Sequence, residues 1–189
     1  MLINIMTPVW RTKNLVKIYE SIPWELDNFY FNFCVVYDGF RSGWLCLKDE
    51  GKRTFEYMVA GTNGDDFAGH KKRNWFLDNV LDGYVYFCDD DNLIHPELFK
   101  NLVGKLDGTS IIMDQYNKND SLRLSHTEPI EVGHVDVGNI LINRKDIGDL
   151  RFEADKYEAD GILFNEIFVK RGVPIKRDAE AKTYYNKLR

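Results

Sequence analysis

Apolar residues follow two alternating patterns along this chain. Continuous apolar, aromatic and β-branched runs predict strands at residues 2–6, 29–37, 84–88, 110–113 and 135–142, with weaker candidates at 53–60 and 173–175. Helical spacing predicts helices near residues 15–22, 72–81, 96–106 and 158–170. We expect the first strand to stop at the Thr7-Pro8 step. Strands that alternate with helices are typical of an α/β sandwich, with a mixed, mostly parallel central sheet and helices on both faces.

Composition narrows the class of protein. The 189 residues are 44% hydrophobic and 29% charged, which is typical of a soluble globular domain. The net charge of −5 argues against a nucleic-acid partner, which selects a basic surface. No Pro/Gly-rich linker divides the chain, so we expect one domain, whose length also fits a module of a longer polypeptide.

Cysteine usage and the first residues bear on the compartment. The three cysteines form no C-x-x-C pair, which indicates reduced thiols and a cytoplasmic location. The apolar start of the chain, residues 1–6, is short and has no basic flank. We therefore expect neither a signal peptide nor a transmembrane segment.

The run Asp89-Asp90-Asp91-Asn92 directly follows the predicted strand 84–88. Ligands of open α/β sheets bind beyond the carboxyl ends of the strands, and Asp38 also ends a predicted strand. Three adjacent carboxylates need solvent or a counter-charge, and carboxylate oxygens suit magnesium or manganese. The alternative is that Asp91 or Asn92 caps the helix that begins near residue 96 and that the other carboxylates are solvated.

The segment from Gly83 to Asn92, preceded by Arg73-Asn74, resembles the DxD region of GT-A-fold glycosyltransferases. It is similar to the large family 2 group, and its DDDN form also resembles the animal glucuronyltransferases. Four further segments resemble landmarks of the family in the expected order: Ile3–Arg11, Val35–Gly39, Val135–Arg144 and Glu158–Leu163. The resemblance implies one GT-A-like domain over residues 1–189, with a nucleotide-binding half at about 1–92 and an acceptor and catalytic half at about 93–189.

The resemblance also implies a role for each matching residue. Asp91, together with Asp89, would ligate a manganese or magnesium ion. The residues matched to nucleotide-sugar binding are Pro8, Arg11, Asp38, Arg73, Asp89, Asp90, Asp136 and Gly138. Asp160 matches the catalytic base, and Glu158 stays open as an alternative, because Ala159 stands where the family has the glutamate of an adjacent Glu-Asp pair.

These roles describe a metal-dependent, inverting glycosyltransferase of the hexosyl- or pentosyltransferase class. The donor would be a nucleotide-sugar, a UDP-sugar by default and a GDP-sugar next, and the acceptor a hydroxyl of a glycan, a protein or a lipid-linked molecule. Two alternatives remain. Ala159 favours a non-catalytic nucleotide- or glycan-binding module of the same fold, and a sugar nucleotidyltransferase ranks lower because residues 7–11 contain no glycine.

Two further expectations concern the C-terminal part of the chain. Asp160 begins a predicted helix, whose N-terminal dipole favours the charged carboxylate. Its basicity should therefore come from its position and not from a raised pKa. The stretch 170–189 holds seven basic and two acidic residues, which we interpret as a solvated terminal helix.

Overall fold

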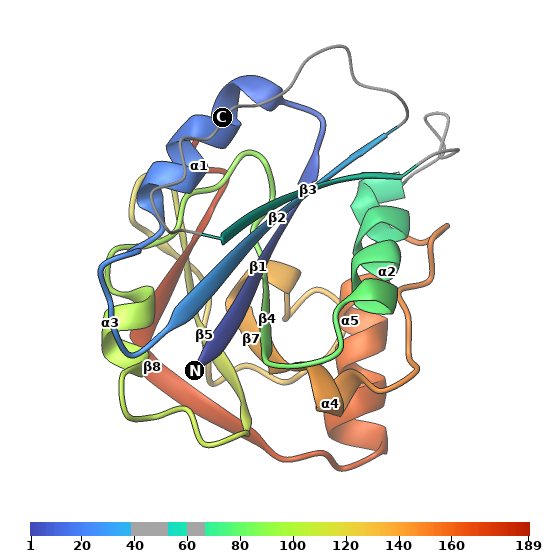
Figure 1. Ribbon diagram of the computed structural model, residues 1–189. Helices are drawn as coiled ribbons and strands as arrows, with labels where there is room; N and C mark the ends of the chain where they lie inside the picture. The colour runs from blue at the N-terminus through green and yellow to red at the C-terminus, as the bar shows by residue number, and fades with distance from the viewer. Residues whose placement is uncertain (39–52, 60–66) are drawn as a thin grey trace.

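The centre of the computed structural model, which describes residues 1–38, 53–59 and 67–189, is a mixed β-sheet (Figure 1). Its order within these residues is β3-β2-β1-β4-β7-β5-β6, and β8 pairs with β5. The β1–β2, β1–β4, β2–β3 and β5–β8 pairs are parallel, and the pairs made by β7 and β6 are antiparallel. The strands are β1 Leu2–Val9, β2 Tyr30–Asp38, β3 Arg53–Val59, β4 Tyr84–Phe87, β5 Ser110–Asn117, β6 Leu122–Leu124, β7 Ile140–Asn143 and β8 Ile175–Tyr185.

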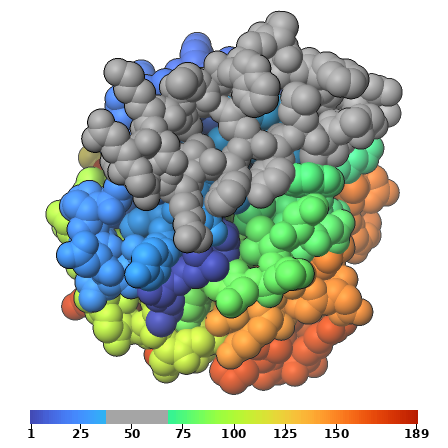
Figure 2. All heavy atoms as spheres, in the orientation of Figure 1, coloured from blue at the N-terminus to red at the C-terminus, as the bar shows by residue number. Residues whose placement is uncertain are grey.

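Helices cover both faces of the sheet. Figure 1 shows α1 and α3 on one face and α2, α4 and α5 on the other, and in Figure 2 the surface of α2 borders that of the α4–α5 region. The expected α/β sandwich is therefore confirmed. The helices are α1 Leu15–Ser21, α2 His70–Asn79, α3 Leu98–Leu102, α4 Arg144–Ile147 and α5 Ala159–Phe164, which continues as a π-helical segment, Asn165–Lys170; 3₁₀ turns occupy Thr12–Asn14, Phe67–Gly69 and Val137–Asn139.

Side chains of successive strand residues enter two separate apolar cores. Ile3 and Ile5 of β1 pack on the α1–α3 face, whereas Met6 packs on the face of α2 and α5. The same alternation puts Tyr86 in the first core and Phe87 in the second. This period of two explains why the central strands read as continuous apolar runs, since both faces are buried.

β1 is longer than expected and includes Pro8. The prediction that the strand stops at the Thr7-Pro8 step is wrong, since Pro8 pairs in parallel register with Val36. The reason lies on the other side of β1, where pairing with β4 ends at Met6 and Phe87. Beyond that point β1 has one neighbour only, so a residue without an N–H fits there, as on an edge strand.

Three expectations about the C-terminal half are also wrong. Residues 175–185 form β8 beside β5 and not a solvated helix. The strand predicted at 135–142 begins only at Ile140, because Asp136 caps a 3₁₀ turn over residues 137–139. The helix expected near residues 96–106 is reduced to α3, and β6 was not predicted. None of the helices in the described ranges is long and apolar enough to span a lipid bilayer.

Candidate active site

The turn after β4 brings three aspartates to the carboxyl end of the sheet, beside the end of β1. Asp90 is buried, with 1% of its surface exposed. Its Oδ2 accepts hydrogen bonds from the backbone N–H groups of Trp10, at 2.6 Å, and of Arg11. Its Oδ1 accepts from Arg11 Nη1 at 2.5 Å. Asp90 therefore fixes the segment that follows β1 against the acidic turn.

Asp91 is buried beside two guanidinium groups. Its Oδ2 lies 2.6 Å from Arg189 Nε and 3.3 Å from Arg11 Nη1. Its carbonyl oxygen accepts a hydrogen bond from Leu188 N at 2.7 Å. The proposed metal-ligating carboxylate is thus in contact with the last residues of the sequence, which sequence reasoning gave no role.

Asp89, the first aspartate of the turn, pairs with Arg73 of α2. Its Oδ1 accepts from Arg73 Nη2 at 2.5 Å. Arg73 is buried, donates a second hydrogen bond to the Ala68 carbonyl oxygen at 2.6 Å, and has an Nε without a hydrogen-bond partner among the described residues. Burial raises the pKa of Asp89, and the nearby charge of Arg73 opposes this effect.

Asp136 and Gly138 lie in the 3₁₀ turn that leads into β7. The Asp136 carboxylate accepts from Gly138 N at 2.8 Å, from Gln115 Nε2 at 3.2 Å and from Arg123 Nη1 at 3.2 Å. A Cβ on Gly138 would lie 2.9 Å from Gln115 Nε2, so a larger residue here would have to displace the Gln115 amide. Gln115 and Arg123 were missed from the sequence, because no local pattern links them to Asp136.

Asp160 stands in the first turn of α5, partly buried, with its Oδ1 accepting from Gly161 N at 2.8 Å. Burial raises the pKa of Asp160 to about 6, and the negative charge of Asp136 adds to the shift. Arg73 and Asp89 also act on it electrostatically, so these four side chains lie close together. The expectation that the pKa of Asp160 is not raised is wrong, because burial outweighs the helix dipole. Glu158 is exposed one residue before the helix.

Pro8, the penultimate residue of β1, and Asp38, the last residue of β2, lie at this same edge. A Cβ on Gly69, the residue that precedes α2, would lie 3.0 Å from Pro8 Cβ, so Pro8 packs against the start of that helix. Asp38 closes β2, but its side chain lies outside the part of the chain that the structure describes. The carboxyl ends of β1, β2 and β4 therefore meet at one rim, as expected for a ligand-binding edge.

The donor set decides which kind of metal site fits this rim. Among the described residues, no three His, Cys, Asp or Glu side chains converge on a position that could hold a metal ion. Asp89 and Asp91 fit a different arrangement, in which one or two carboxylates share a magnesium- or manganese-type ion with substrate phosphates and water. The residues present therefore fit a metal that is bound together with a phosphate ligand.

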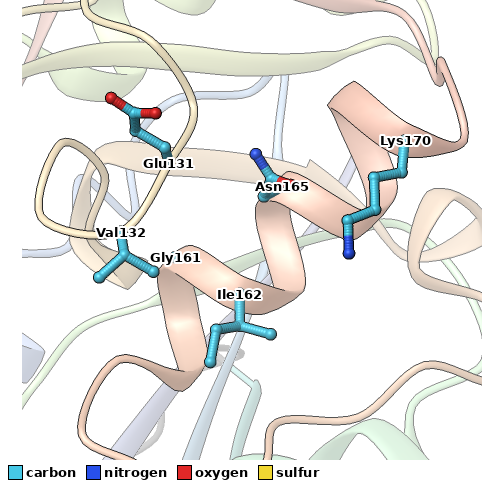
Figure 3. Close-up of a pocket in the computed structure, with 6 residues that line it drawn as sticks. All are labelled: Glu131, Val132, Gly161, Ile162, Asn165 and Lys170. Carbon is cyan, nitrogen blue, oxygen red and sulfur yellow. The ribbon is translucent and has the colours of Figure 1, made fainter.

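A cavity of about 340 Å³ opens beside α5 and does not belong to this cluster. It lies between the loop at Glu131 and Val132 and the helix residues Gly161, Ile162 and Asn165 (Figure 3). At about 100° per residue, these three helix positions point roughly 100–160° away from Asp160. The cavity is therefore on the outer side of the helix, away from the carboxylates.

The fold is the GT-A fold of nucleotide-sugar glycosyltransferases, as comparison with solved structures shows. Residues 1–349 of TarS from S. aureus superpose with a TM-score of 0.65 at 13% sequence identity, over 98% of this chain and 58% of that one. The same protein has been solved with UDP-GlcNAc, with a TM-score of 0.65. The mannosyltransferase PcManGT from Pyrobaculum calidifontis, solved with GDP-Man and Mn²⁺, gives a TM-score of 0.66 at 14% identity, over 97% of this chain and 56% of that one.

At these identities the similarity establishes the fold. This chain spans little more than half of those two structures. It matches no protein-family model and no curated protein sequence.

Proposed function

We propose that this protein is a metal-dependent, inverting glycosyltransferase that moves a sugar from a nucleotide-sugar to an acceptor hydroxyl. The observation that carries the proposal is that Asp91 and Asp160 both act electrostatically on, or are acted on by, the Asp89–Arg73 ion pair at the carboxyl ends of the strands. The same fold holds UDP-GlcNAc in TarS and GDP-Man in PcManGT. A UDP-sugar is our first hypothesis for the donor, and a GDP-sugar the second.

The donor phosphates would meet the arginine side of this cluster. Arg73 already holds Asp89, and its buried Nε is without a partner among the described residues, so its guanidinium has capacity for an anionic oxygen. Arg11 lies at the end of β1, where its backbone is fixed by Asp90. Asp91, with Asp89, would hold a manganese or magnesium ion that neutralises the leaving diphosphate as a Lewis acid.

Asp160 is the proposed general base. The acceptor oxygen attacks the anomeric carbon, the bond from this carbon to the phosphate oxygen breaks, and the hydroxyl proton passes to the Asp160 carboxylate. A carboxylate with a pKa of about 6 is a stronger base than an ordinary aspartate and is still ionised at neutral pH. Attack on the face opposite the leaving group would invert the configuration of the sugar.

Ala159 favoured a non-catalytic binding module, but its burial offers another explanation. The residue is 0% exposed and packs in the core shared by α2 and α5. A glutamate at this position would bury a charged group without a partner, which is costly. The alanine therefore follows from the packing of α5 and leaves Asp160 available for catalysis.

The proposal is tested by a thermal-shift screen of nucleotide-sugars with and without Mn²⁺, followed by a transfer assay with the donor that stabilises the protein. A ligand that binds only the folded state raises stability by RT ln(1 + [L]/Kd), so the true donor should stand out. We expect stabilisation that needs the metal, followed by release of the nucleoside diphosphate. Stabilisation without turnover would favour the binding module, and no stabilisation by any nucleotide-sugar would contradict the proposal.

A further inference from the structure

The last four residues form a hook over the acidic turn. After β8, Asn186 adopts a φ of 55°, a left-handed conformation that asparagine tolerates better than most residues. The chain then turns back, and Leu188 packs against the first core. The Leu188 N–H donates to the Asp91 carbonyl oxygen at 2.7 Å, and this backbone contact brings Arg189 to the Asp91 carboxylate.

Lys187 anchors the other side of the hook. Its backbone N–H donates to Asn92 Oδ1 at 3.4 Å. Its Nζ donates to the Lys118 carbonyl oxygen at 3.1 Å and to Asp120 Oδ1 at 2.9 Å, both in the turn between β5 and β6. The segment 186–189 is thus fixed to two separate parts of the fold. These contacts of Lys187 and Leu188 hold the backbone of Arg189 close to Asp91.

The two charged side chains at this contact, Asp91 and Arg189, differ in their exposure to solvent. The Asp91 side chain is 6% exposed, whereas that of Arg189 is 55% exposed. A buried carboxylate needs a counter-charge, and Arg11, the other cation in contact, is closer to Asp90 than to Asp91. A metal ion that binds Asp91 Oδ2 would be repelled by the guanidinium 2.6 Å from the same oxygen.

We propose that Arg189 is the resident counter-cation of Asp91, and that a divalent metal ion binds Asp91 by displacing Arg189 onto the donor diphosphate. The inference rests on the proposed function, because it takes Asp91 as a metal ligand. A guanidinium pairs with phosphate oxygens as well as with carboxylates, so the exchange leaves no charge unpaired. Metal and nucleotide then strengthen each other's binding.

The test measures Mn²⁺ affinity from the electron paramagnetic resonance signal of the free ion, first without nucleotide. Arg189→Gln should bind Mn²⁺ about 3- to 10-fold more tightly than the wild type, the range expected when a half-exposed ion pair stops competing. Saturating UDP, with GDP in parallel, should then tighten Mn²⁺ binding by a larger factor in the wild type than in the variant. The variant has no guanidinium to pass to the diphosphate.

Lys182→Gln is the matched control. It also removes one positive charge from the C-terminal region, but Lys182 pairs with Glu97 at 2.9 Å and not with the acidic turn. We expect its Mn²⁺ affinity to stay within about 2-fold of the wild type. Equal tightening in both variants would indicate a general effect of net charge and would overturn the inference.

The remaining outcomes separate this inference from the proposed function. If Arg189→Gln and the wild type bind Mn²⁺ equally, or both too weakly to measure, while UDP or GDP still binds, the inference alone is wrong. If the wild type binds neither Mn²⁺ nor any nucleotide-sugar, the proposed function fails first, and the inference fails with it.

Discussion

The acidic turn after β4 and the start of α5 carry carboxylates at the same end of the sheet, but only those of the turn are paired with arginines among the described residues. Each aspartate of the turn lies against an arginine from a distant part of the chain, Asp89 against Arg73, Asp90 against Arg11, and Asp91 against Arg189. Asp160 has no arginine in direct contact among the described residues. Burial and the charge of Asp136 raise its pKa to about 6, whereas at Asp89 the charge of Arg73 opposes the effect of burial.

This difference separates two chemical tasks. The arginines paired with the aspartates of the turn are cations that an incoming diphosphate can share. A buried carboxylate without such a partner holds its charge at a cost, and it lowers that cost by accepting a proton. The turn is therefore suited to binding phosphate and metal, and Asp160 is suited to removing a proton.

The largest effect should come from the turn. Asp91→Ala removes the carboxylate proposed to hold the metal, and we expect nucleotide-sugar turnover to fall by about 10³-fold, the scale of a lost Lewis-acid contribution. A chelator should inactivate the wild type to a similar degree. The assay follows nucleoside diphosphate release with added Mn²⁺. Asp78→Asn, at an exposed surface pair with Arg151, serves as the control, and full wild-type activity in chelator would remove the metal role of the turn.

The next effect concerns the base. Asp160→Asn keeps the shape of the side chain but cannot accept the proton, so turnover should fall by about 10²-fold or more while donor binding is preserved. Glu158→Gln is the matched control, since Glu158 is exposed next to the helix start, and it should cost much less. For the wild type, turnover under kcat/KM conditions should rise with pH through about 6, as Asp160 ionises. An inactive Glu158→Gln beside an active Asp160→Asn would assign the base to Glu158.

How much of this division could be predicted differs between the two halves of the chain. β1 and β4 carry apolar side chains on both faces, so their burial is visible in the sequence as continuous runs. β8 has no such run. It is held by pairing with β5 and by ion pairs such as Lys105–Asp178 and Lys182–Glu97, which depend on residues far away in the sequence. The excess positive charge that suggested a solvated helix belongs in part to these pairs.

In the candidate site, too, contacts between residues far apart in the sequence could not be predicted. The order of motifs pointed to the acidic turn and to Asp160, but the contact partners Arg123, Gln115 and Arg189 have no local signal. Asp136 and Asn139 did offer one, because Asp at the first position and Asn three residues later can form a capping box. That signal would have replaced the start of the predicted strand at 135–142 with the 3₁₀ turn that positions Asp136.

A smaller effect, on stability, should distinguish Asp90 from its neighbours. Asp90 accepts two backbone N–H groups and the Arg11 guanidinium in a buried position. Asp90→Asn would turn an amide group toward these donors, and we expect it to lower the free energy of unfolding by about 2 kcal/mol. Urea unfolding measures the change. Asp78→Asn, at an exposed pair with Arg151, should stay within about 0.5 kcal/mol of the wild type, and a similar value for Asp90→Asn would show that Asp90 does not hold the β1 segment.

The smallest effect is a pH-dependent change in stability, and its sign tests whether Asp160 is a carboxylate without a charge partner. The folded protein raises the pKa of Asp160 from 3.8 to about 6. Between these values the folded state keeps a proton that the unfolded chain releases, so this group's contribution to stability is lost as pH rises from about 4 to about 6. Asp160→Asn cannot ionise and avoids that loss. It should therefore be more stable than the wild type at pH 8, on the order of 1–2 kcal/mol, and equal to it near pH 4. Urea unfolding of both proteins at the two pH values, with Glu158→Gln as a control that shows no such pH-dependent gain, measures the difference. A variant that is less stable than the wild type at pH 8 would mean that Asp160 is a stabilising, charge-paired carboxylate like those of the turn.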